Sequence, residues 1–463
     1  MSKKITNSAK VVARTVEGIV TDIPTMNKEM TCFSGRAAGV CYMADSYSRI
    51  CEQGDARALS RADGNAHNGH HSVYDHPHIS LELNITKAMA MILNSLGVYS
   101  TSEKSARYTV MAPETEIENE MYQKWIQKIQ KLILDKYPDY DDTAIKSGIE
   151  KEIMQESNWK FAVCSGQVVL MSPKDGIYGI DKVNERLNEI AKVIKCRQSM
   201  PSYKLAMENA RYMISVFTPT TMIYTISFRQ AMLTIDYLKK LSADCDKLSA
   251  KNIFFKKLKE HCDSVAIVLE ENIGELRLKD IKNQKIRVFD NCIYSEASDK
   301  EECIGDSYTL RYTGSLAMFA QAQRHRTLRY SMFIPNDGDR KYFIPPIVKE
   351  AGLGDEWTTD IQKVDYCVPQ GTLVDITEQG IFEDFALKCK ERLCGRAQLE
   401  IAISTSESVR KFVDNKDKLC TYNRGLLGNI IENDVAVPRC GFEDFKCTEG
   451  CRWGIKHGLD RLI

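Results

Sequence analysis

The chain has 463 residues, of which 43% are hydrophobic and 27% are charged, and these values are ordinary for a globular protein. Its 63 Lys and Arg residues balance 63 Asp and Glu residues, so the formal net charge is +0. This balance gives no reason to expect a nucleic-acid polymer or an anionic membrane surface as a partner. The length suits about two or three domains.

The N-terminal sequence does not predict a secretory signal. The N-terminus begins Met1-Ser2-Lys3-Lys4 and continues without the apolar segment of a secretory signal. The longest uncharged run, 212–228, is too short and too polar for a comfortable membrane span. The 16 cysteines are scattered, which favours buried thiols over a disulfide framework. We therefore expect a cytoplasmic protein without a membrane partner.

Strand and helix patterns alternate in the first half of the chain. Residues 78–85 alternate apolar and polar side chains, which predicts a strand, and the Ala- and Met-rich residues 86–96 predict a helix. A loop carrying Glu103–Tyr108 is expected next. Further helices are predicted at 116–137, from Asp181 onward, and at 203–215, 228–241 and 253–271.

The pattern returns after a polar connector. Residues 308–312 alternate like the first strand, and 316–321 resembles the helix that follows it, with the numbering shifted by 229. A long helical pattern then spans 381–412. Few residues agree in identity, so the repeat is only suggestive by itself. The predicted division is a first repeat, a connector, a second repeat and a Cys-containing tail: 1–272, 273–306, 307–420 and 421–463.

Two fragments concentrate anion-binding groups. Residues 321–326, Gln-Ala-Gln-Arg-His-Arg, present two planar guanidinium forks and a histidine, and the alternative interpretation is a solvated basic turn. Residues 102–108, Ser-Glu-Lys-Ser-Ala-Arg-Tyr, offer a carboxylate, hydroxyls, a guanidinium and a phenol. Taken alone, this second fragment also suits a helix-capping box.

Other familiar site patterns are missing from the sequence. Five of the eight histidines lie between His67 and His78, and the tail contains Cys440, Cys447 and Cys451, but neither set has the usual spacing of a zinc site. We therefore expect no metal. The chain also contains no dinucleotide-binding GxGxxG after a strand, no GxxxxGK[ST] and no GxSxG.

Together the two fragments resemble the signature of the flavin-dependent thymidylate synthases, the ThyX family, RHRxxSxNExSxRY. Arg324-His325-Arg326, with Gln321 three positions earlier, matches the first part, whereas residues 103–108 match the ExSxRY part. Asn68–His76 resembles the upstream segment HGHxSxxEH. Each repeat lacks the part that the other keeps, since RHR falls on 95–97 in the first repeat and ExSxRY on 332–337 in the second.

The C-terminal motifs of the family are divided in the same way. Ala210-Arg211 resembles the family's AR pair in the first repeat, where the later family arginine falls on Leu238. In the second repeat Arg392 occupies that later position, but the earlier arginine position falls on Asp365. Residues 396–401 resemble the family's AQxEI run.

This resemblance implies an α/β (α+β) fold of two ThyX-like repeats, each a mixed sheet packed with long helices, forming a pseudo-dimer. It implies reductive methylation of dUMP to dTMP at a composite site, with FAD as cofactor and NADPH and methylenetetrahydrofolate as co-substrates. Self-association of the chain as a homodimer would then form a pseudo-tetramer. Two alternatives stay open: a related flavoenzyme that modifies dUMP at C5, for example by hydroxymethylation, and an inactive nucleotide-binding or scaffold homologue.

The resemblance also implies roles for individual residues. The expected dUMP contacts are Gln321, Glu103, Ser105, Arg107, Arg211 and Arg392. The expected FAD contacts are Arg324, His325, Arg326, Thr327, His70, Ser72 and Asp75. Ser105 and Arg392 are the expected catalytic residues, because Arg392 near a uracil carbonyl would stabilise negative charge as hydride arrives. The chain departs from the family pattern at Ser102, Cys41, Ser227 and Ile381.

Overall fold

The structure is a computed structural model that describes residues 17–43, 45–104, 111–140, 160–164, 167–172, 176–178, 185, 201–250, 252–273, 301–445 and 453–463. The chain divides into two compact units. Unit one contains Met1–Ile79, Ile226–Leu238 and Ser264–Lys285, and unit two contains Ser80–Thr225, Lys239–Asp263 and Ile286–Ile463. The predicted boundaries at residues 272, 306 and 420 stay predictions.

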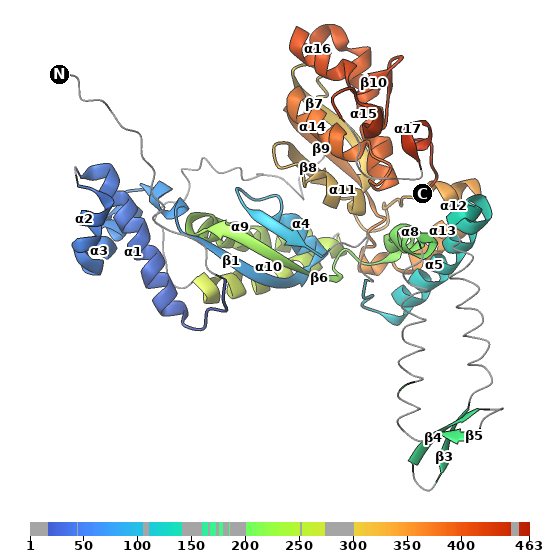
Figure 1. Ribbon diagram of the computed structural model, residues 1–463, viewed down its shortest axis with the longest axis horizontal. Helices are drawn as coiled ribbons and strands as arrows, with labels where there is room; N and C mark the ends of the chain where they lie inside the picture. Colours follow the sequence, from blue (N-terminus) through green and yellow to red (C-terminus); the bar gives the residue numbers. More distant parts are fainter. Residues whose placement is uncertain are drawn as a thin grey trace. The chain divides into compact units, whose positions relative to one another are not determined.

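The N-terminal part of unit one is helical (Figure 1). It contains α1 (Ile23–Tyr42), α2 (Tyr47–Glu52), α3 (Gly54–His67) and a 3-10 helix, η1 (His71–Asp75). A Cβ at Gly35 of α1 would lie 1.8 Å from the carbonyl oxygen of Ala58 in α3, so only glycine permits this close crossing. The contact continues through the buried Ala38 and Ala62.

The first sheet has the strand order β1-β6-β2, from β1 (His78–Thr86), β6 (Pro219–Ser227) and β2 (Ser100–Glu103). Helix α4 (Lys87–Leu93) follows β1 directly and is capped by Thr86, whose hydroxyl accepts from the Met89 N–H at 3.3 Å. The predicted strand at 78–85 and the predicted helix after it are therefore confirmed, although the helix ends three residues earlier than expected.

The second sheet has the order β7-β9-β8, from β7 (Ser307–Ser315), β9 (Leu373–Ile381) and β8 (Arg329–Phe333), and both strand pairs are antiparallel. Helix α11 (Leu316–Ala322) follows β7 and is capped by Ser315, whose hydroxyl accepts from the Met318 N–H at 3.0 Å. Helix α14 (Phe382–Arg392) follows β9. These elements lie in unit two.

The elements of the two sheets occur at constant spacings. Strand β7, helix α11 and strand β8 begin 229 positions after β1, α4 and β2, as from His78 to Ser307. Strand β9 and helix α14 begin 154 positions after β6 and α9 (Phe228–Leu248), as from Pro219 to Leu373. The same 154 positions separate two 3-10 helices, η3 (Arg211–Met213) and η4 (Asp365–Cys367).

Hydrogen bonding keeps the same spacings. Ser100 pairs with Thr225 between β2 and β6, and their counterparts Arg329 and Gln379 pair between β8 and β9. The first amide of α4 donates to the Thr218 carbonyl, and the first amide of α11 donates to the carbonyl of its counterpart Thr372, each at 3.0 Å. The two sets of elements therefore share topology as well as order.

The two sets also meet each other symmetrically. Ser215 forms an isolated antiparallel bridge with Pro369, its own counterpart 154 positions later. On either side, the Val216 N–H donates to the Val368 carbonyl at 2.9 Å and the Gln370 N–H donates to the Ile214 carbonyl at 2.8 Å. Reciprocal pairing of this kind is typical of an isologous contact, in which one segment of two related parts meets its equivalent.

A helical core lies in unit two around Trp125 and Trp357, whose rings pack edge to face with centroids 4.8 Å apart. Trp125 also donates from its indole nitrogen to Asp360 at 3.0 Å, which satisfies the buried polar group. The surrounding helices are α5 (Glu116–Lys136), α8 (Pro201–Ala210), α12 (Pro346–Glu350) and α13 (Gly354–Lys363). The predicted helix at 116–137 is thereby confirmed.

The predicted single helix over 381–412 is wrong. The chain forms α14, breaks at 393–398, and resumes as α15 (Leu399–Asp414). The break contains Gly395 and a tight turn in which the Ala397 N–H donates to the Cys394 carbonyl at 2.8 Å. The helix predicted from Asp181 lies outside the described residues, apart from residue 185.

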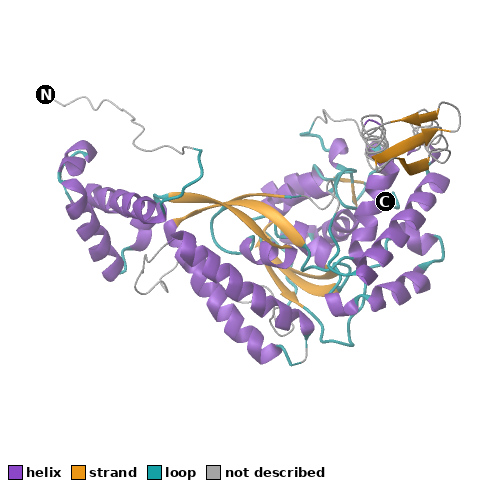
Figure 2. Ribbon diagram, turned by 90° about the horizontal axis from the view of Figure 1, so that it is seen from below, coloured by secondary structure: helices purple, strands orange, loops and turns teal. Residues whose placement is uncertain are grey.

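The remaining elements are α10 (Ile253–Ile273), β3 (Lys160–Cys164), β4 (Gln167–Ser172), β5 (Gly176–Tyr178), α16 (Thr421–Gly428), β10 (Ile431–Glu432), β11 (Val435–Ala436), α17 (Gly454–His457), η2 (Pro138–Tyr140), η5 (Lys416–Lys418) and η6 (Arg439–Gly441). Figure 2 shows helices together with small sheets, and the predicted α/β (α+β) class is confirmed. None of the described helices is both long and apolar enough to pass through a membrane.

Candidate functional site

Glu103 is the centre of a buried charge cluster in unit two. It is the last residue of β2, where it pairs with Met222 of β6, so the expectation that a loop carries Glu103 is wrong. Its side chain is 7% exposed. One carboxylate oxygen accepts from Arg324 Nη2 at 2.8 Å, and the other accepts from Lys87 Nζ at 2.5 Å. The structure thus joins the two predicted fragments, although Ser105 and Arg107 lie outside the described residues.

A second group of predicted dUMP contacts meets at Gln398, which lies just before α15. The Oε1 atom of Gln398 accepts from Arg211 Nη2 and also from Gln321 Nε2. Arg211 is 4% exposed, and its Nε is buried without a hydrogen-bond partner among the described residues. A buried donor of this kind is costly unless a ligand or water satisfies it.

The network continues into the core from Gln398. Its amide nitrogen donates to the Tyr212 hydroxyl, which donates to Glu400 at 2.9 Å. Glu400 also accepts from the backbone N–H of Ser315 at 2.7 Å and from its hydroxyl at 2.6 Å. Burial raises the pKa of both Tyr212 and Glu400. The network therefore anchors Gln398 to the start of α11, the helix that carries Gln321.

His325 and Arg392 form a direct contact. Arg392 Nε lies 2.8 Å from His325 Nε2, and Arg392 Nη2 donates to the Gln321 carbonyl at 3.2 Å. Because a guanidinium can only donate, His325 Nε2 must accept, which places the ring proton on Nδ1. Burial, reinforced by the positive charges of Arg392 and Lys388, lowers the pKa of His325 to about 2. His325 is therefore neutral at physiological pH.

Arg326 lies on the other side of the same turn. Its guanidinium donates to the Tyr99 carbonyl at 2.7 Å and sits 4.5 Å from the centroid of the Tyr99 ring. Nearby, both amide atoms of Gln323 are buried without hydrogen-bond partners among the described residues. Thr327 is exposed in the loop before β8. Orphaned amide groups beside a cationic turn suit the polar edge and phosphates of a bound nucleotide cofactor such as FAD.

The other predicted FAD residues lie in unit one, at or next to η1. His70 and Ser72 are exposed, whereas Asp75 is half-buried. Asp75 accepts from Ser227 Oγ at 2.9 Å and from Arg229 Nη1 at 2.8 Å. Asp75 therefore already has two partners at the junction between β6 and α9.

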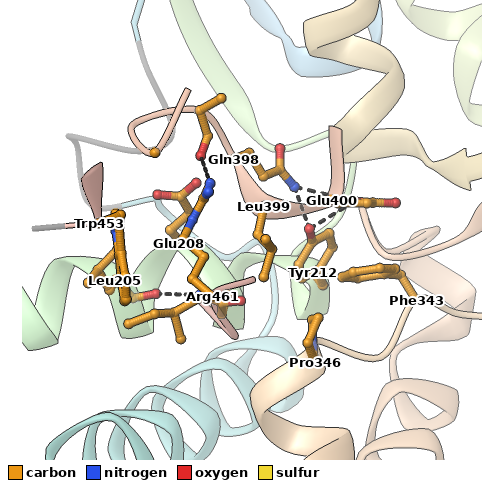
Figure 3. A pocket seen from close by; sticks show the side chains of 14 residues that line it. Leu205, Glu208, Tyr212, Phe343, Pro346, Gln398, Leu399, Glu400, Trp453 and Arg461 are labelled. Atoms are coloured by element: carbon orange, nitrogen blue, oxygen red, sulfur yellow. Dashed lines mark hydrogen bonds between the residues drawn. The ribbon is translucent and has the colours of Figure 1, made fainter. Parts of the chain in front are cut away.

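Figure 3 shows a small cavity beside the Gln398 network. Its volume is about 30 Å³, which suits a water molecule and no larger ligand. Tyr212, Gln398 and Glu400 form one wall, and Arg461 donates to the Ala397 carbonyl at 2.6 Å on another side. A larger groove of about 520 Å³ lies over the β7-β9-β8 sheet, and no predicted site residue lines it.

The counterpart positions in the other set of elements carry different chemistry. The counterparts of Arg211, Glu103, Arg324 and Gln321 are Asp365, Met332, Ser95 and Ile92. Asp365 accepts from Arg340 Nη1 at 2.9 Å and from the Tyr342 hydroxyl at 2.7 Å. Arg340 is 1% exposed and also donates to Asn252 at 3.1 Å. We call the position of Arg211 the first location and the counterpart position of Asp365 the second location. The second location is occupied by this internal ion pair.

Sequence reasoning missed Lys87 in the Glu103 cluster and Gln398 in the second group. Lys87 stands two residues after the predicted strand at 78–85, where no motif marks it. Gln398 belongs to a segment that resembles the AQxEI run, and this resemblance was the available signal for it. Among the residues that the structure describes, no group of three or more His, Cys, Asp or Glu is arranged to hold a metal ion. Cys447 and Cys451 lie outside that part of the chain.

The α+β fold and the cations on Glu103 give this protein a candidate anion-binding site, assembled from two sets of elements. Residues 26–246 match the family model described as thymidylate synthase complementing protein. This segment of the chain is therefore similar to that family, the ThyX family, and to its general thymidylate synthase-like function. The match ends before β7, so it does not include the second set of elements. No curated protein and no solved structure shows a significant match to the chain.

Proposed function

We propose that the chain is an FAD-dependent thymidylate synthase that methylates dUMP to dTMP, with methylenetetrahydrofolate and NADPH as co-substrates, at one composite site per chain. The observation that carries this proposal is that Lys87 and Arg324 both donate to the single carboxylate of Glu103, while the positive charge of Arg211 acts on Lys87. Two positive charges are then left over, which suits the phosphate of a nucleoside monophosphate.

We also propose that the chain is a fused pair of ThyX-like repeats, an intramolecular pseudo-dimer. The constant spacings of 229 and 154 positions and the reciprocal bridge between Ser215 and Pro369 support this proposal. Each repeat contributes what the other lacks. Glu103 and Arg211 come from the first set of elements, and Gln321, Arg324 and Arg392 come from the second.

In this proposal the phosphate of dUMP binds Arg211 with Ser105 and Arg107. The unpartnered Nε of Arg211 supports this assignment, because it offers a buried donor for an anion. Gln321 and Glu103 contact the sugar and the uracil ring. Their side chains come from α11 and β2, elements whose positions are set by backbone hydrogen bonding.

Arg392 is the proposed electrostatic catalyst. Its guanidinium is held by His325 Nε2 and the Gln321 carbonyl, so it is preorganised before substrate arrives. Because His325 is neutral, it does not repel Arg392. A guanidinium held in this way can stabilise negative charge at a uracil carbonyl. When bound, FAD would supply the hydride transfer, and Arg324, Arg326, Thr327 and the orphaned Gln323 amide are the residues of unit two that would hold it.

The test is dUMP-dependent NADPH oxidation by the purified protein, measured with and without methylenetetrahydrofolate and followed by mass analysis of the nucleotide. We expect dTMP as the product and a bound-flavin absorption spectrum. Arg107→Ala and Arg326→Ala should each abolish the reaction, because each removes one half of the composite site. A hydroxymethylated product would favour a different C5 modification. A colourless protein that does not take up added FAD would contradict the proposal.

A further inference from the structure

Lys87 is a buried cation that the family resemblance does not assign to the site. It is the first residue of α4, and its side chain is 14% exposed. Its Nζ donates to Glu103 at 2.5 Å and to the Lys104 carbonyl at 2.7 Å. The backbone N–H of Lys87 donates to the Thr218 carbonyl, so both ends of the residue are held by the β1-β6-β2 sheet or its edge.

The fold itself does not require a lysine at this position. The counterpart of Lys87 at the start of α11 is Leu316, which is fully buried. A positive charge at the first residue of a helix is also disfavoured by the backbone dipole. Burying an ammonium group is costly unless it is paired and hydrogen-bonded. The lysine therefore does not favour helix formation. The contact that explains its position is the hydrogen bond from its ammonium group to the carboxylate of Glu103.

Lys87 completes the orientation of the Glu103 carboxylate. One oxygen accepts from Lys87 and lies 3.4 Å from Thr220 Oγ1. The other accepts from Arg324 at 2.8 Å and lies 3.5 Å from Asn94 Nδ2. With a cation on each oxygen, the carboxylate is fixed in one plane. Removing Lys87 would leave one oxygen with only the long contact to Thr220.

We propose that Lys87 is a positioning residue of the nucleotide site, which holds Glu103 in the orientation that accepts hydrogen bonds from the sugar and uracil of dUMP. This inference rests on the proposed function and deepens it, because it adds a residue that acts through Glu103. The ammonium group also adds to the positive potential created by Arg211 and Arg324.

A double-mutant cycle on dUMP affinity tests the proposal. Lys87→Met should weaken dUMP binding, measured calorimetrically, by about 10- to 100-fold, the usual effect of losing a charge-assisted hydrogen bond. In the Glu103→Gln background the same change should cost less than about threefold, because Lys87 acts through the carboxylate. Lys131→Met, which changes an exposed lysine of α5, is the matched control and should leave the affinity unchanged.

A second arm uses Lys87→Arg and pH. Burial, the largest cause, lowers the pKa of Lys87, and the charges of Arg211 and Arg324 act in the same direction against the opposing effect of Glu103. Arginine stays charged at higher pH. The affinity of Lys87→Arg for dUMP should therefore be near that of the wild type at pH 7 and should persist to higher pH. If Lys87 had only a structural role, Lys87→Arg would not change the pH at which dUMP affinity falls on the alkaline side.

The outcomes separate this inference from the proposed function. Equal losses for Lys87→Met in the wild-type and Glu103→Gln backgrounds, or no loss at all, would overturn the role of Lys87 and leave the proposed function intact. If Lys87→Met does not fold, Lys87→Arg provides the test. The role of Lys87 is then overturned if the dUMP affinity of Lys87→Arg falls at the same alkaline pH as that of the wild type. A wild-type protein that does not bind dUMP would overturn both.

Discussion

Arg324 Nη2 lies 2.8 Å from Glu103 Oε2, and this contact joins residues 221 positions apart in the chain. Each residue belongs to the part of the ThyX-like signature that the other set of elements lacks. The contact brings the two parts of the signature together in one cluster. Lys87 also belongs to this cluster, and the positive charge of Arg211 acts on Lys87. Complementary motif parts in two sets of elements, together with one assembled cluster, are what the proposed fused pair with a single working site would show.

Arg324→Ala should weaken the binding of both dUMP and FAD by about 10- to 100-fold, because the same guanidinium pairs with Glu103, a proposed dUMP contact, and is itself a proposed FAD contact. Calorimetry for dUMP and flavin fluorescence for FAD would measure the two effects. Arg329→Ala is the control, since Arg329 is exposed at the start of the next strand, β8. Equal behaviour of the two variants would contradict an assignment of Arg324 to the site.

Titration of the protein with dUMP should reach saturation at one nucleotide per chain. At the second location Asp365 stands where the first has Arg211, and Arg340 is already paired with Asp365 at 2.9 Å. A phosphate there would meet the carboxylate of Asp365, and both terminal nitrogens of Arg340 already donate to Asp365 and Asn252. Binding of two nucleotides per chain with similar affinity would show that the second location is also open.

His325→Gln should flatten the acid side of the stability profile. The folded protein keeps His325 neutral down to a pKa of about 2, whereas the unfolded chain takes up its proton near pH 6.5. The contribution of His325 to the free energy of unfolding is therefore fully present above about pH 6.5, and it falls as the pH drops towards 2.

The wild type should accordingly lose about 2 kcal/mol more than His325→Gln between pH 7 and pH 5, in denaturant unfolding at each pH. His261, whose pKa burial also lowers, is present in both proteins and cancels in the comparison. Parallel profiles for the two proteins would mean that His325 can accept a proton in the folded state.

Lys388→Met should lower the free energy of unfolding by roughly 3–5 kcal/mol, because it leaves a buried carboxylate without its cation. Lys388 Nζ donates to Glu378 at 2.6 Å, with side chains 2% and 0% exposed. The hydroxyls of Tyr308 and Tyr312 also donate to Glu378, at 2.9 and 2.6 Å.

Lys390→Met is the control for Lys388→Met on the same helix. Lys390 pairs with Asp444 where both side chains are about one-third exposed or more, so its loss should cost only about 0–1 kcal/mol. Denaturant unfolding of the two variants compares a buried and an exposed ion pair. Similar losses would show that the Lys388–Glu378 pair is not desolvated in solution.

Local patterns in the sequence were sufficient for several elements. Alternation over 78–85 predicted β1, and the spacing of Met121, Trp125 and Ile129 predicted α5. The same patterns were insufficient at 381–412, where apolar spacing continued through a break that Gly395 permits. The buried Glu378 was also unpredictable, since its counterpart in the first set of elements is Tyr224, and nothing local indicates that three donors will surround it.

The sequence by itself determined the strand-and-helix order of the chain and the division of the ThyX-like signature between two segments. These features depend on side-chain periods and motif spacing, which are local properties of the chain. Only the tertiary structure decided that Glu103 meets Arg324 and Lys87, and that Gln398 joins Arg211 to Gln321. Contacts between residues so far apart depend on strand register and on the way the two sets of elements pack together, which no local pattern encodes.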